Sequence, residues 1–195
     1  EQNGFEIELI VIDDGSTDGS TSFLSQLMES GKYKFRLILN SNQGVCKTLN
    51  EGIRRYSSGD YIAILASDDL WNASKLELQL RELNNNSLSQ FCFSQAIEFL
   101  DGSDINLGRK FPKKCSTGHV LNKVFLAQHV PAGTIMFTKR LYDDLGGFDE
   151  TLKEEDWDFV IRAASLTNFC AVQKPLLHYR SHETNAMKVT PRRLI

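Results

Sequence analysis

The stretch that decides the fold is residues 7–19, IELIVIDDGSTDG. Residues 7–12 form a short, nearly continuous apolar run rich in β-branched side chains, which is typical of a strand covered on both faces. Residues 13–19 then supply the Asp, Gly, Ser and Thr residues that favour turns and helix starts. Apolar residues recur at helical spacing directly after this loop, at Phe23, Leu24, Leu27 and Met28. A strand, a polar loop and a helix are therefore predicted in succession.

The same order recurs twice more along the chain. A second strand is predicted over residues 35–39, followed by a helical stripe over residues 45–53. A third strand is predicted over residues 61–66, followed by a helix over residues 74–83 that opens with a capping box. Three strand–helix units in succession indicate right-handed crossovers and a mostly parallel sheet, and hence an α/β fold.

The second half of the chain is less regular. We predict strands over residues 90–99, 134–138 and 170–177, a loop over 100–114, an amphipathic helix over 118–128, and a helix around Trp157. The sequence shows no internal repeat, low-complexity tract or linker, so residues 1–195 are predicted to form one domain.

Composition excludes several classes of protein. The chain has 195 residues, a net charge of −3 and a pI near 5.8, so it has no basic excess for binding nucleic acid. No apolar run approaches the ~20 residues that cross a bilayer, and the opening residues EQNG lack the features of a signal peptide. Four scattered cysteines without a CxxC pair indicate reduced, buried thiols and no zinc site. We expect a cytoplasmic protein, with peripheral association at the cytoplasmic face of a membrane as the alternative.

Acidic residues gather at three places, namely Asp13-Asp14 after the first strand, Asp68-Asp69 after the third, and residues 154–158 at a helix start. The carboxyl ends of parallel strands line the ligand crevice of an open sheet, although helix capping also explains acids at these positions. Adjacent acids at the end of a buried strand repel each other unless a cation such as Mg²⁺ or Mn²⁺ neutralises them. The chain has no GxGxxG and no GxxxxGK[ST], which argues against a dinucleotide dehydrogenase and a P-loop NTPase.

Ordered motifs span nearly the whole chain: DDGSTD at 13–18, NQG at 42–44, NEG at 50–52, GDYI at 59–62, SDD at 67–69, GGFDE at 146–150, EDWD at 155–158 and YRSH at 179–182. Together they resemble the inverting family 2 glycosyltransferases, which use nucleotide-activated sugars. The resemblance implies a GT-A fold, a three-layer α/β/α arrangement with a mostly parallel central sheet. A Rossmann-like nucleotide-sugar-binding half would cover residues 1–99 and a mixed acceptor-binding half residues 100–195. The family's first strand and helix have no counterpart in this sequence, which we therefore expect to be N-terminally truncated.

The resemblance also implies a role for each matching residue of the donor site. Asp13 and Asp14 would bind the nucleotide sugar, with Asp14 contacting the base, and Asp68 would bind the ribose. Asp69 would ligate the Mn²⁺ or Mg²⁺ that holds the diphosphate, and His182 would lie at the metal. The donor implied is a nucleoside-diphosphate sugar, most often a UDP-sugar in the family.

Asp156 matches the family's general base, which removes the proton of the acceptor hydroxyl in a single displacement with inversion. The acceptor implied is a glycan or a lipid-linked sugar, as in cell-surface polysaccharide synthesis. We expect Asp14, Asp69 and Asp156 to line one cavity. Two alternatives stay open: a sugar-nucleotide pyrophosphorylase, and a non-catalytic module that binds nucleotide sugars or glycans. The module is kept open by Ala66, which stands where many relatives have a third acid.

Overall fold

The computed structural model describes residues 5–102, 108–152 and 156–182. The chain forms two compact units, each of which takes segments from both halves of the sequence. One unit comprises residues 4–62 and 137–166, and the other comprises residues 1–3, 63–136 and 167–195. We call them the 4–62 unit and the 63–136 unit. No helix among the described residues combines the length and the apolar character needed to cross a membrane.

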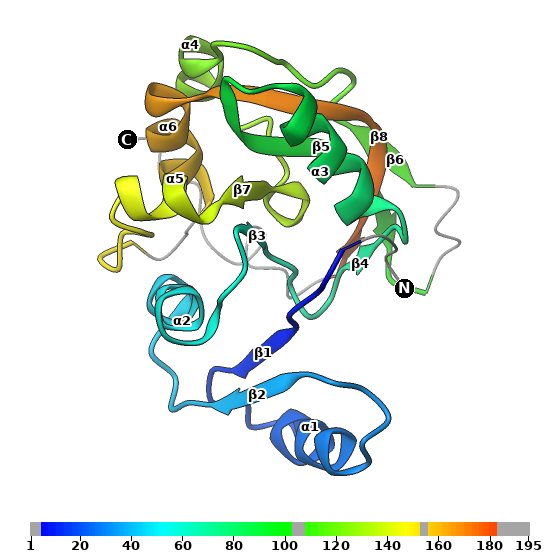
Figure 1. Cartoon of the computed structure of the whole chain (residues 1–195). Coiled ribbons are helices and arrows are strands. Elements are labelled where there is room, and N and C mark those ends of the chain that lie inside the picture. The colour runs from blue at the N-terminus through cyan, green and yellow to red at the C-terminus, as the bar shows by residue number, and fades with distance from the viewer. Residues whose placement is uncertain (1–4, 103–107, 153–155, 183–195) are drawn as a thin grey trace. The chain divides into compact units, whose positions relative to one another are not determined.

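The 4–62 unit begins with the predicted strand–helix alternation (Figure 1). Its elements are β1 (Ile10–Asp13), α1 (Ser20–Glu29), β2 (Arg36–Leu39), α2 (Val45–Glu51) with a π-helical turn (Gly52–Tyr56), β3 (Tyr61–Ala63), α5 (Lys139–Asp144) and α6 (Asp156–Leu166). Strands β1 and β2 pair in parallel, from Ile10 opposite Arg36 to Asp13 opposite Leu39. The parallel pairing agrees with the crossover predicted from the sequence.

The core of the 4–62 unit joins segments that lie about a hundred residues apart. Four aromatic side chains, Phe137, Tyr142, Phe148 and Phe159, pack with ring centroids 4.4–6.5 Å apart. Asn50 of α2 is 1% exposed and ties this cluster to the helix. Its Oδ1 accepts hydrogen bonds from the Tyr142 hydroxyl (2.6 Å) and the Phe148 N–H (2.9 Å), while its Nδ2 donates to the Phe148 carbonyl (2.9 Å).

The GGFDE loop requires a glycine at position 147. Gly147 has φ +87°, and a Cβ atom there would lie 2.6 Å from Asn50 Oδ1 and 2.9 Å from the Tyr142 hydroxyl. Only a residue without a side chain both adopts this conformation and leaves space for the buried amide. Asn50 of the NEG motif therefore packs directly against Gly147 and Phe148 of the GGFDE motif.

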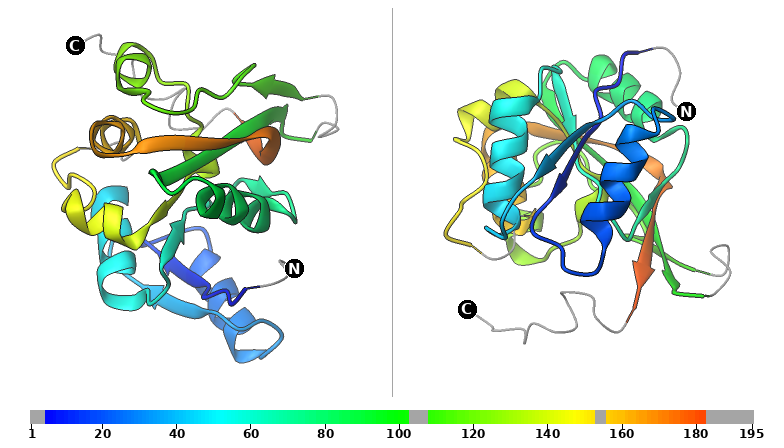
Figure 2. Two further views of the ribbon diagram at one scale, coloured as in Figure 1. Left: turned by 45° about the horizontal axis from the view of Figure 1, so that its top comes forward. Right: turned by 90° about the horizontal axis from the view of Figure 1, so that it is seen from below.

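The 63–136 unit is built on two long parallel strands. It contains β4 (Leu70–Trp71), α3 (Lys75–Asn85), β5 (Ser89–Leu100), β6 (Arg109–Phe111), α4 (Leu121–Leu126), a 3-10 helix (Ala132–Thr134) and β8 (Asn168–Ser181). Strands β5 and β8 run in parallel from Ser89 opposite Asn168 to Leu100 opposite Ser181. Short antiparallel pairings add β6 to β5 and β4 to β8. In Figure 2, left, α3 lies on one side of β8, and α4 and β6 lie on the other. The boundary between the units passes through β3 and through β7 (Met136–Thr138).

The structure corrects several predicted boundaries. Strand β3 ends at Ala63 instead of continuing to Ala66, because the following residues turn toward Asp69, whose N–H bonds the Ala66 carbonyl (3.3 Å). The predicted loop over 100–114 contains β6, whose three residues are too few to show a period in the sequence. The short strand β4 and the helix α5 were not predicted, for the same reason.

Candidate active site

Asp13 ends β1 and fixes the loop that follows it. Its carboxylate accepts hydrogen bonds from the Ser16 N–H (2.9 Å) and from the Thr21 hydroxyl. Hydrogen bonding by Ser16, followed by Thr21, lowers the pKa of Asp13 below its usual value, so the carboxylate is ionised at neutral pH. The side chain is 5% exposed. Asp13 therefore holds the DDGSTD loop in shape, and both of its oxygens already have donors.

Asp14 accepts hydrogen bonds from the backbone that directly precedes α2. Its Oδ1 accepts the Gln43 N–H (3.1 Å) and its Oδ2 accepts the Gly44 N–H (3.0 Å). These N–H groups precede the first turn of α2, where backbone donors lack partners within the helix. Capping is thus one real role of Asp14, although the capped helix is α2 and not the adjacent α1. The half-buried carboxylate keeps lone pairs for a ligand beyond these two bonds.

Asp156 is the first residue of α6, so its carboxylate sits at the positive end of the helix dipole. Its Oδ1 accepts the N–H of the next residue, Trp157 (2.7 Å). Trp157 is 40% exposed, so its ring reaches solvent. The neighbouring Asp158 is committed to Arg162, with its Oδ2 2.7 Å from Nη2. The glutamates of residues 153–155 lie outside the described residues.

In the 63–136 unit, residues at the end of β8 form hydrogen bonds and an ion pair with the Asp68-Asp69 pair. The Arg180 N–H donates to Asp69 Oδ1 (2.9 Å), the Arg180 Nε donates to the Asp68 carbonyl (2.9 Å), and His182 Nε2 lies 3.0 Å from Asp68 Oδ2. Asp101 pairs with the other side of the Arg180 guanidinium at 2.7 Å. The YRSH and SDD motifs, more than a hundred residues apart in sequence, therefore form one cluster.

The charged form of Asp69 is disfavoured by its surroundings in this cluster. It is 7% exposed, and burial raises its pKa to about 6, with the charge of Asp68 adding to the effect. The Arg180 N–H and the nearby Arg180 and His182 side chains oppose this rise without cancelling it. Its second oxygen, Oδ2, receives no hydrogen bond from the described residues. A cation would stabilise the charged form of this carboxylate, which burial and the charge of Asp68 disfavour.

The chemistry of these residues fits a divalent cation that shares its coordination with a phosphate ligand. Within the described ranges, no group of three or more His, Cys, Asp or Glu side chains is arranged as a complete metal site. Mg²⁺ and Mn²⁺ are commonly held by one or two carboxylates, with substrate phosphates and water completing the shell. Asp69, with His182 beside Asp68, supplies such a partial set.

A set of residues next to Asp69, namely Gly133, Trp71 and Lys75, was not predicted from the sequence. A Cβ atom on Gly133 would lie 2.9 Å from Leu177 Cδ2 and 3.4 Å from Asp69 Oδ2, so a larger residue here would require the Leu177 side chain to shift. Trp71 Nε1 donates to the Gly133 carbonyl (2.9 Å). The fully buried Lys75 lies 4.2 Å above the Trp71 ring, and burial lowers its pKa to about 7.

Helix α3 supplies a second anchor for these residues, because Gln79 Nε2 donates to the Thr134 carbonyl (2.8 Å). The sequence did carry a signal for these residues. Lys75 and Gln79 occupy the same helical face as the apolar Leu83, at a spacing of four residues, and polar residues on a buried stripe are rare without a specific partner.

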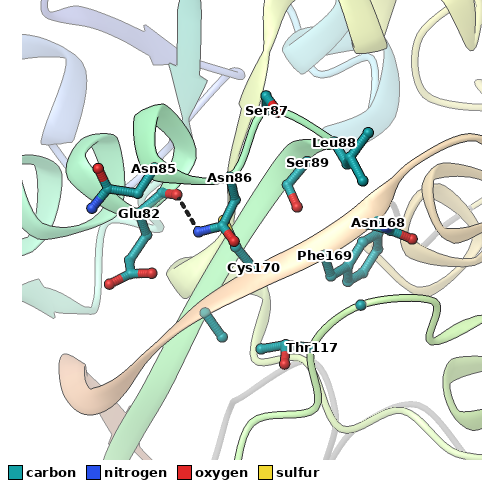
Figure 3. Close-up of a pocket in the computed structure, with 12 residues that line it drawn as sticks. Glu82, Asn85, Asn86, Ser87, Leu88, Ser89, Thr117, Asn168, Phe169 and Cys170 are labelled. Atoms are coloured by element: carbon teal, nitrogen blue, oxygen red, sulfur yellow. Dashed lines mark hydrogen bonds between the residues drawn. The ribbon is translucent and has the colours of Figure 1, made fainter.

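A hollow of about 550 Å³ in the same unit lies away from these acids (Figure 3). It is lined mainly by polar side chains from the end of α3 and from the starts of β5 and β8, including Glu82, Asn86 and Asn168. These are the amino ends of the parallel strands, whereas Arg180 and His182 lie at the carboxyl end of β8. Since ligands of open α/β sheets bind beyond the carboxyl ends of the strands, the Asp68-Asp69 cluster is the better candidate.

The predicted site residues are thus divided between the two units. The structure brings Asp68, Asp69 and His182 together in the 63–136 unit, while Asp13, Asp14 and Asp156 belong to the 4–62 unit. The expectation that Asp14, Asp69 and Asp156 line one cavity stays a prediction.

Comparisons with known proteins agree with these motifs. The family model described as Glycosyl transferase family 2 matches residues 1–146. An uncharacterized glycosyltransferase of Nostoc sp., alr2836, is 24% identical over 192 residues, covering 94% of this chain and 58% of the relative. The putative teichuronic acid biosynthesis glycosyltransferase TuaG of Bacillus subtilis is 31% identical over 99 residues, covering 51% of this chain and 39% of TuaG. The chain therefore spans about half the length of these relatives.

Two solved structures show the same fold. S. aureus TarS (residues 1–349) in complex with UDP-GlcNAc superposes with a TM-score of 0.69 at 18% identity, covering 94% of this chain and 52% of TarS. The mannosyltransferase PcManGT of Pyrobaculum calidifontis, in complex with GDP-Man and Mn²⁺, gives a TM-score of 0.62 at 17% identity, covering 89% of this chain and 47% of PcManGT. Both are GT-A glycosyltransferases, so the predicted α/β fold class is confirmed.

Proposed function

Since the chain belongs to glycosyl transferase family 2, we propose that it moves a sugar from a nucleoside-diphosphate sugar to an acceptor hydroxyl with inversion at the anomeric carbon. The observation that carries the proposal is the cluster in which Arg180 and His182 fix the Asp68-Asp69 pair. It leaves the second carboxylate oxygen of Asp69 without a donor among the described residues, which fits a cation-bound diphosphate.

A UDP-sugar is the donor we propose, by analogy with TarS, which was crystallised with UDP-GlcNAc. Asp14 would accept a hydrogen bond from the base, and Asp68 would accept hydrogen bonds from the ribose hydroxyls. Asp13, whose oxygens are already bonded to Ser16 and Thr21, would contribute by holding the loop. The N-terminal half of the chain would in this way select the donor.

We further propose that Asp69 and His182 hold Mn²⁺ or Mg²⁺, as the Mn²⁺ in the PcManGT structure suggests for the fold. When bound, the cation would neutralise the charge that develops on the leaving nucleoside diphosphate. Asp69 would then be fully ionised despite its burial, because the cation compensates its charge. Arg180 would keep the carboxylate in place through the bond to Asp69 Oδ1.

Asp156 would act as the general base. One of its carboxylate oxygens would take the proton of the acceptor hydroxyl while that hydroxyl's oxygen bonds to the anomeric carbon. The bond between the anomeric carbon and the diphosphate oxygen would break in the same step, which inverts the configuration. The position of Asp156 at the N-terminus of α6 favours the ionised carboxylate that this role requires.

For the acceptor and the cellular setting, we propose a glycan or lipid-linked acceptor in cell-surface polysaccharide synthesis, since TuaG is named for teichuronic acid biosynthesis. All four cysteines are buried, which agrees with thiols that stay reduced in the cytoplasm. The non-catalytic module remains the second candidate, because Ala66 stands where many relatives have a third acid.

Release of nucleoside diphosphate from a panel of nucleotide sugars, measured with the full chain and Mn²⁺, tests the proposal. The Asp156→Asn variant should lose at least about a hundredfold in rate, because general base catalysis typically supplies this much. Asp144→Asn, which removes an acid at the end of α5 that pairs with the exposed Arg140, is the matched control. Donor binding without turnover for every donor would favour the non-catalytic module.

A further inference from the structure

The most unusual charge distribution in the chain lies in the stretch that leads from β6 to α4. Although the net charge is −3, residues 105–142 contain no Asp or Glu. The part of this stretch in the 63–136 unit carries five Lys and Arg side chains, Arg109, Lys110, Lys113, Lys114 and Lys123. The proposed sugar transfer uses none of them.

The backbone that carries these residues lies on one side of β8. Figure 2, left, shows β6, α4 and the chain between them on the side of β8 opposite α3. Reciprocal bonds fix the connecting chain to β8, because the Cys115 N–H donates to Gln173 Oε1 (2.9 Å) and Gln173 Nε2 donates to the Cys115 carbonyl (2.9 Å). Lys123 Nζ reaches Ser116 Oγ (3.4 Å), which ties α4 to the connecting chain two residues after Lys114.

Neighbouring acids neutralise little of this charge. Among the residues that the structure describes, Arg109 pairs with Glu98 at 2.8 Å, and no carboxylate lies within ion-pair distance of Lys110, Lys113, Lys114 or Lys123. Asp101, which directly follows β5, forms its ion pair with Arg180. Four exposed lysines therefore keep their full charge toward solvent.

Helix α4 adds two apolar side chains to this basic surface. Phe125 is 67% exposed and Leu126 is 81% exposed, while Val120 and Val124 on the inner side are each 1% exposed. The buried valines anchor the helix, so the outward position of Phe125 and Leu126 is fixed by packing. Phe125 and Leu126 therefore present two adjacent apolar side chains to solvent beside the lysines of this stretch.

We propose that this surface, formed by Lys110, Lys113, Lys114, Lys123, Phe125 and Leu126, docks the protein on an anionic membrane. The lysines would attract acidic headgroups, and Phe125 and Leu126 would enter the boundary between headgroups and acyl chains. Charge complementarity selects this partner, and the apolar pair favours a lipid surface over a nucleic acid, which would gain nothing from it. The association brings a transferase of lipid-linked or surface glycans to its substrates, but does not depend on that activity.

Co-sedimentation of the full chain with vesicles tests the docking surface. Vesicles of phosphatidylcholine with about 30% phosphatidylglycerol should bind the protein roughly several hundredfold more tightly than pure phosphatidylcholine, since each of the four lysines contributes roughly a fivefold factor. Lys113→Ala with Lys114→Ala should weaken this binding by about 25-fold, and high salt should weaken it further. Phe125→Ser with Leu126→Ser should weaken it by at least about tenfold.

Matched controls separate the surface from general charge and hydrophobicity. Lys32→Ala with Lys34→Ala removes two exposed lysines of the other unit, and Leu88→Ser removes a leucine that is 76% exposed; neither should change vesicle binding. The emission of a Phe125→Trp variant should shift to the blue on anionic vesicles.

Four results would overturn the proposal. They are equal binding to neutral and anionic vesicles, an equal loss in the control variants, binding of soluble polyanions that the serine variant retains, and a concentration-dependent dimer that the serine variant abolishes. None of these measurements needs a donor sugar, so failure here is distinguishable from failure of the proposed transfer.

Discussion

Replacing Asp69 by asparagine should stabilise the protein, although the residue is proposed to be essential. The side-chain amide of the Asp69→Asn variant keeps an oxygen for the Arg180 N–H, which bonds Asp69 Oδ1 at 2.9 Å in wild type, and removes a buried charge beside Asp68. Because the folded state raises the pKa of Asp69 to about 6 from 3.8, the folded protein holds this proton longer than the unfolded chain does. Stability therefore falls as pH rises from about 4 to about 7.

The size of the effect follows from the pKa difference between the folded and the unfolded chain. This difference costs wild type about 3 kcal/mol at pH 8, roughly half of that at pH 5, and less than about 1 kcal/mol at pH 4. An asparagine carries no such cost at any pH. The Asp69→Asn variant should thus gain stability over wild type progressively between pH 4 and pH 8, which corresponds to several degrees in Tm for a chain of this size.

Urea denaturation at pH 4, 5, 6, 7 and 8 measures this gain. A Trp157→Phe background leaves Trp71, which lies in the same unit as Asp69, as the fluorescent reporter. Glu77→Gln is the matched control, since Glu77 is an exposed acid of that unit and its loss should change stability by less than about 0.5 kcal/mol at every pH. An Asp69→Asn variant that is less stable than wild type at pH 8, or whose advantage does not grow with pH, would refute the reasoning.

Three further predictions test other parts of the structure. Asn50→Ala should lower the free energy of unfolding by about 3 kcal/mol or more in urea titrations, because it leaves the Tyr142 hydroxyl and the Phe148 N–H without their buried acceptor. Lys75→Met should stabilise the protein at pH 6 and lose most of this advantage toward pH 10. The pKa of the buried amine is lowered to about 7 from 10.5, so its cost to folding falls as pH rises from 7 toward the pKa of the unfolded chain. A pH-independent difference between the two melting curves would contradict this. His182→Gln should reduce Mn²⁺-dependent turnover roughly tenfold to a hundredfold at limiting Mn²⁺ and much less at saturating Mn²⁺, and an unchanged Mn²⁺ titration would remove His182 from the proposed metal site.

The regular parts of the fold were predictable because their patterns are local. Strands β1 and β2 and helices α1, α3 and α6 follow from apolar periodicity, and their crossovers follow from the handedness of parallel units. Burial within those elements was less predictable. Val45 belongs to the predicted apolar stripe of α2 but is 40% exposed, whereas Asn50 is 1% exposed. The reason is that Asn50 binds a loop nearly a hundred residues away, and no local pattern records that loop.

The acidic pairs show where sequence reasoning about a site stops. Asp13-Asp14 and Asp68-Asp69 look alike in the sequence, since each pair follows a strand and precedes a helix. Their electrostatics differ because their partners differ. Asp13 gains donors from the eight residues that follow it, which lower its pKa.

Asp69, in contrast, is buried against the end of β8, where a single N–H from Arg180 bonds one oxygen and the charge of Asp68 opposes ionisation. Hydrogen bonds from nearby donors stabilise the charged form of Asp13, which serves to hold its loop. Burial with one donor disfavours the charged form of Asp69, which a bound cation would stabilise. On this criterion, the acid to mutate first in a search for the donor cation is Asp69 and not Asp13. Asp69→Asn should abolish the increase in Tm that Mn²⁺ with UDP gives wild type, and an Asp69→Asn variant that retains it would place the cation elsewhere.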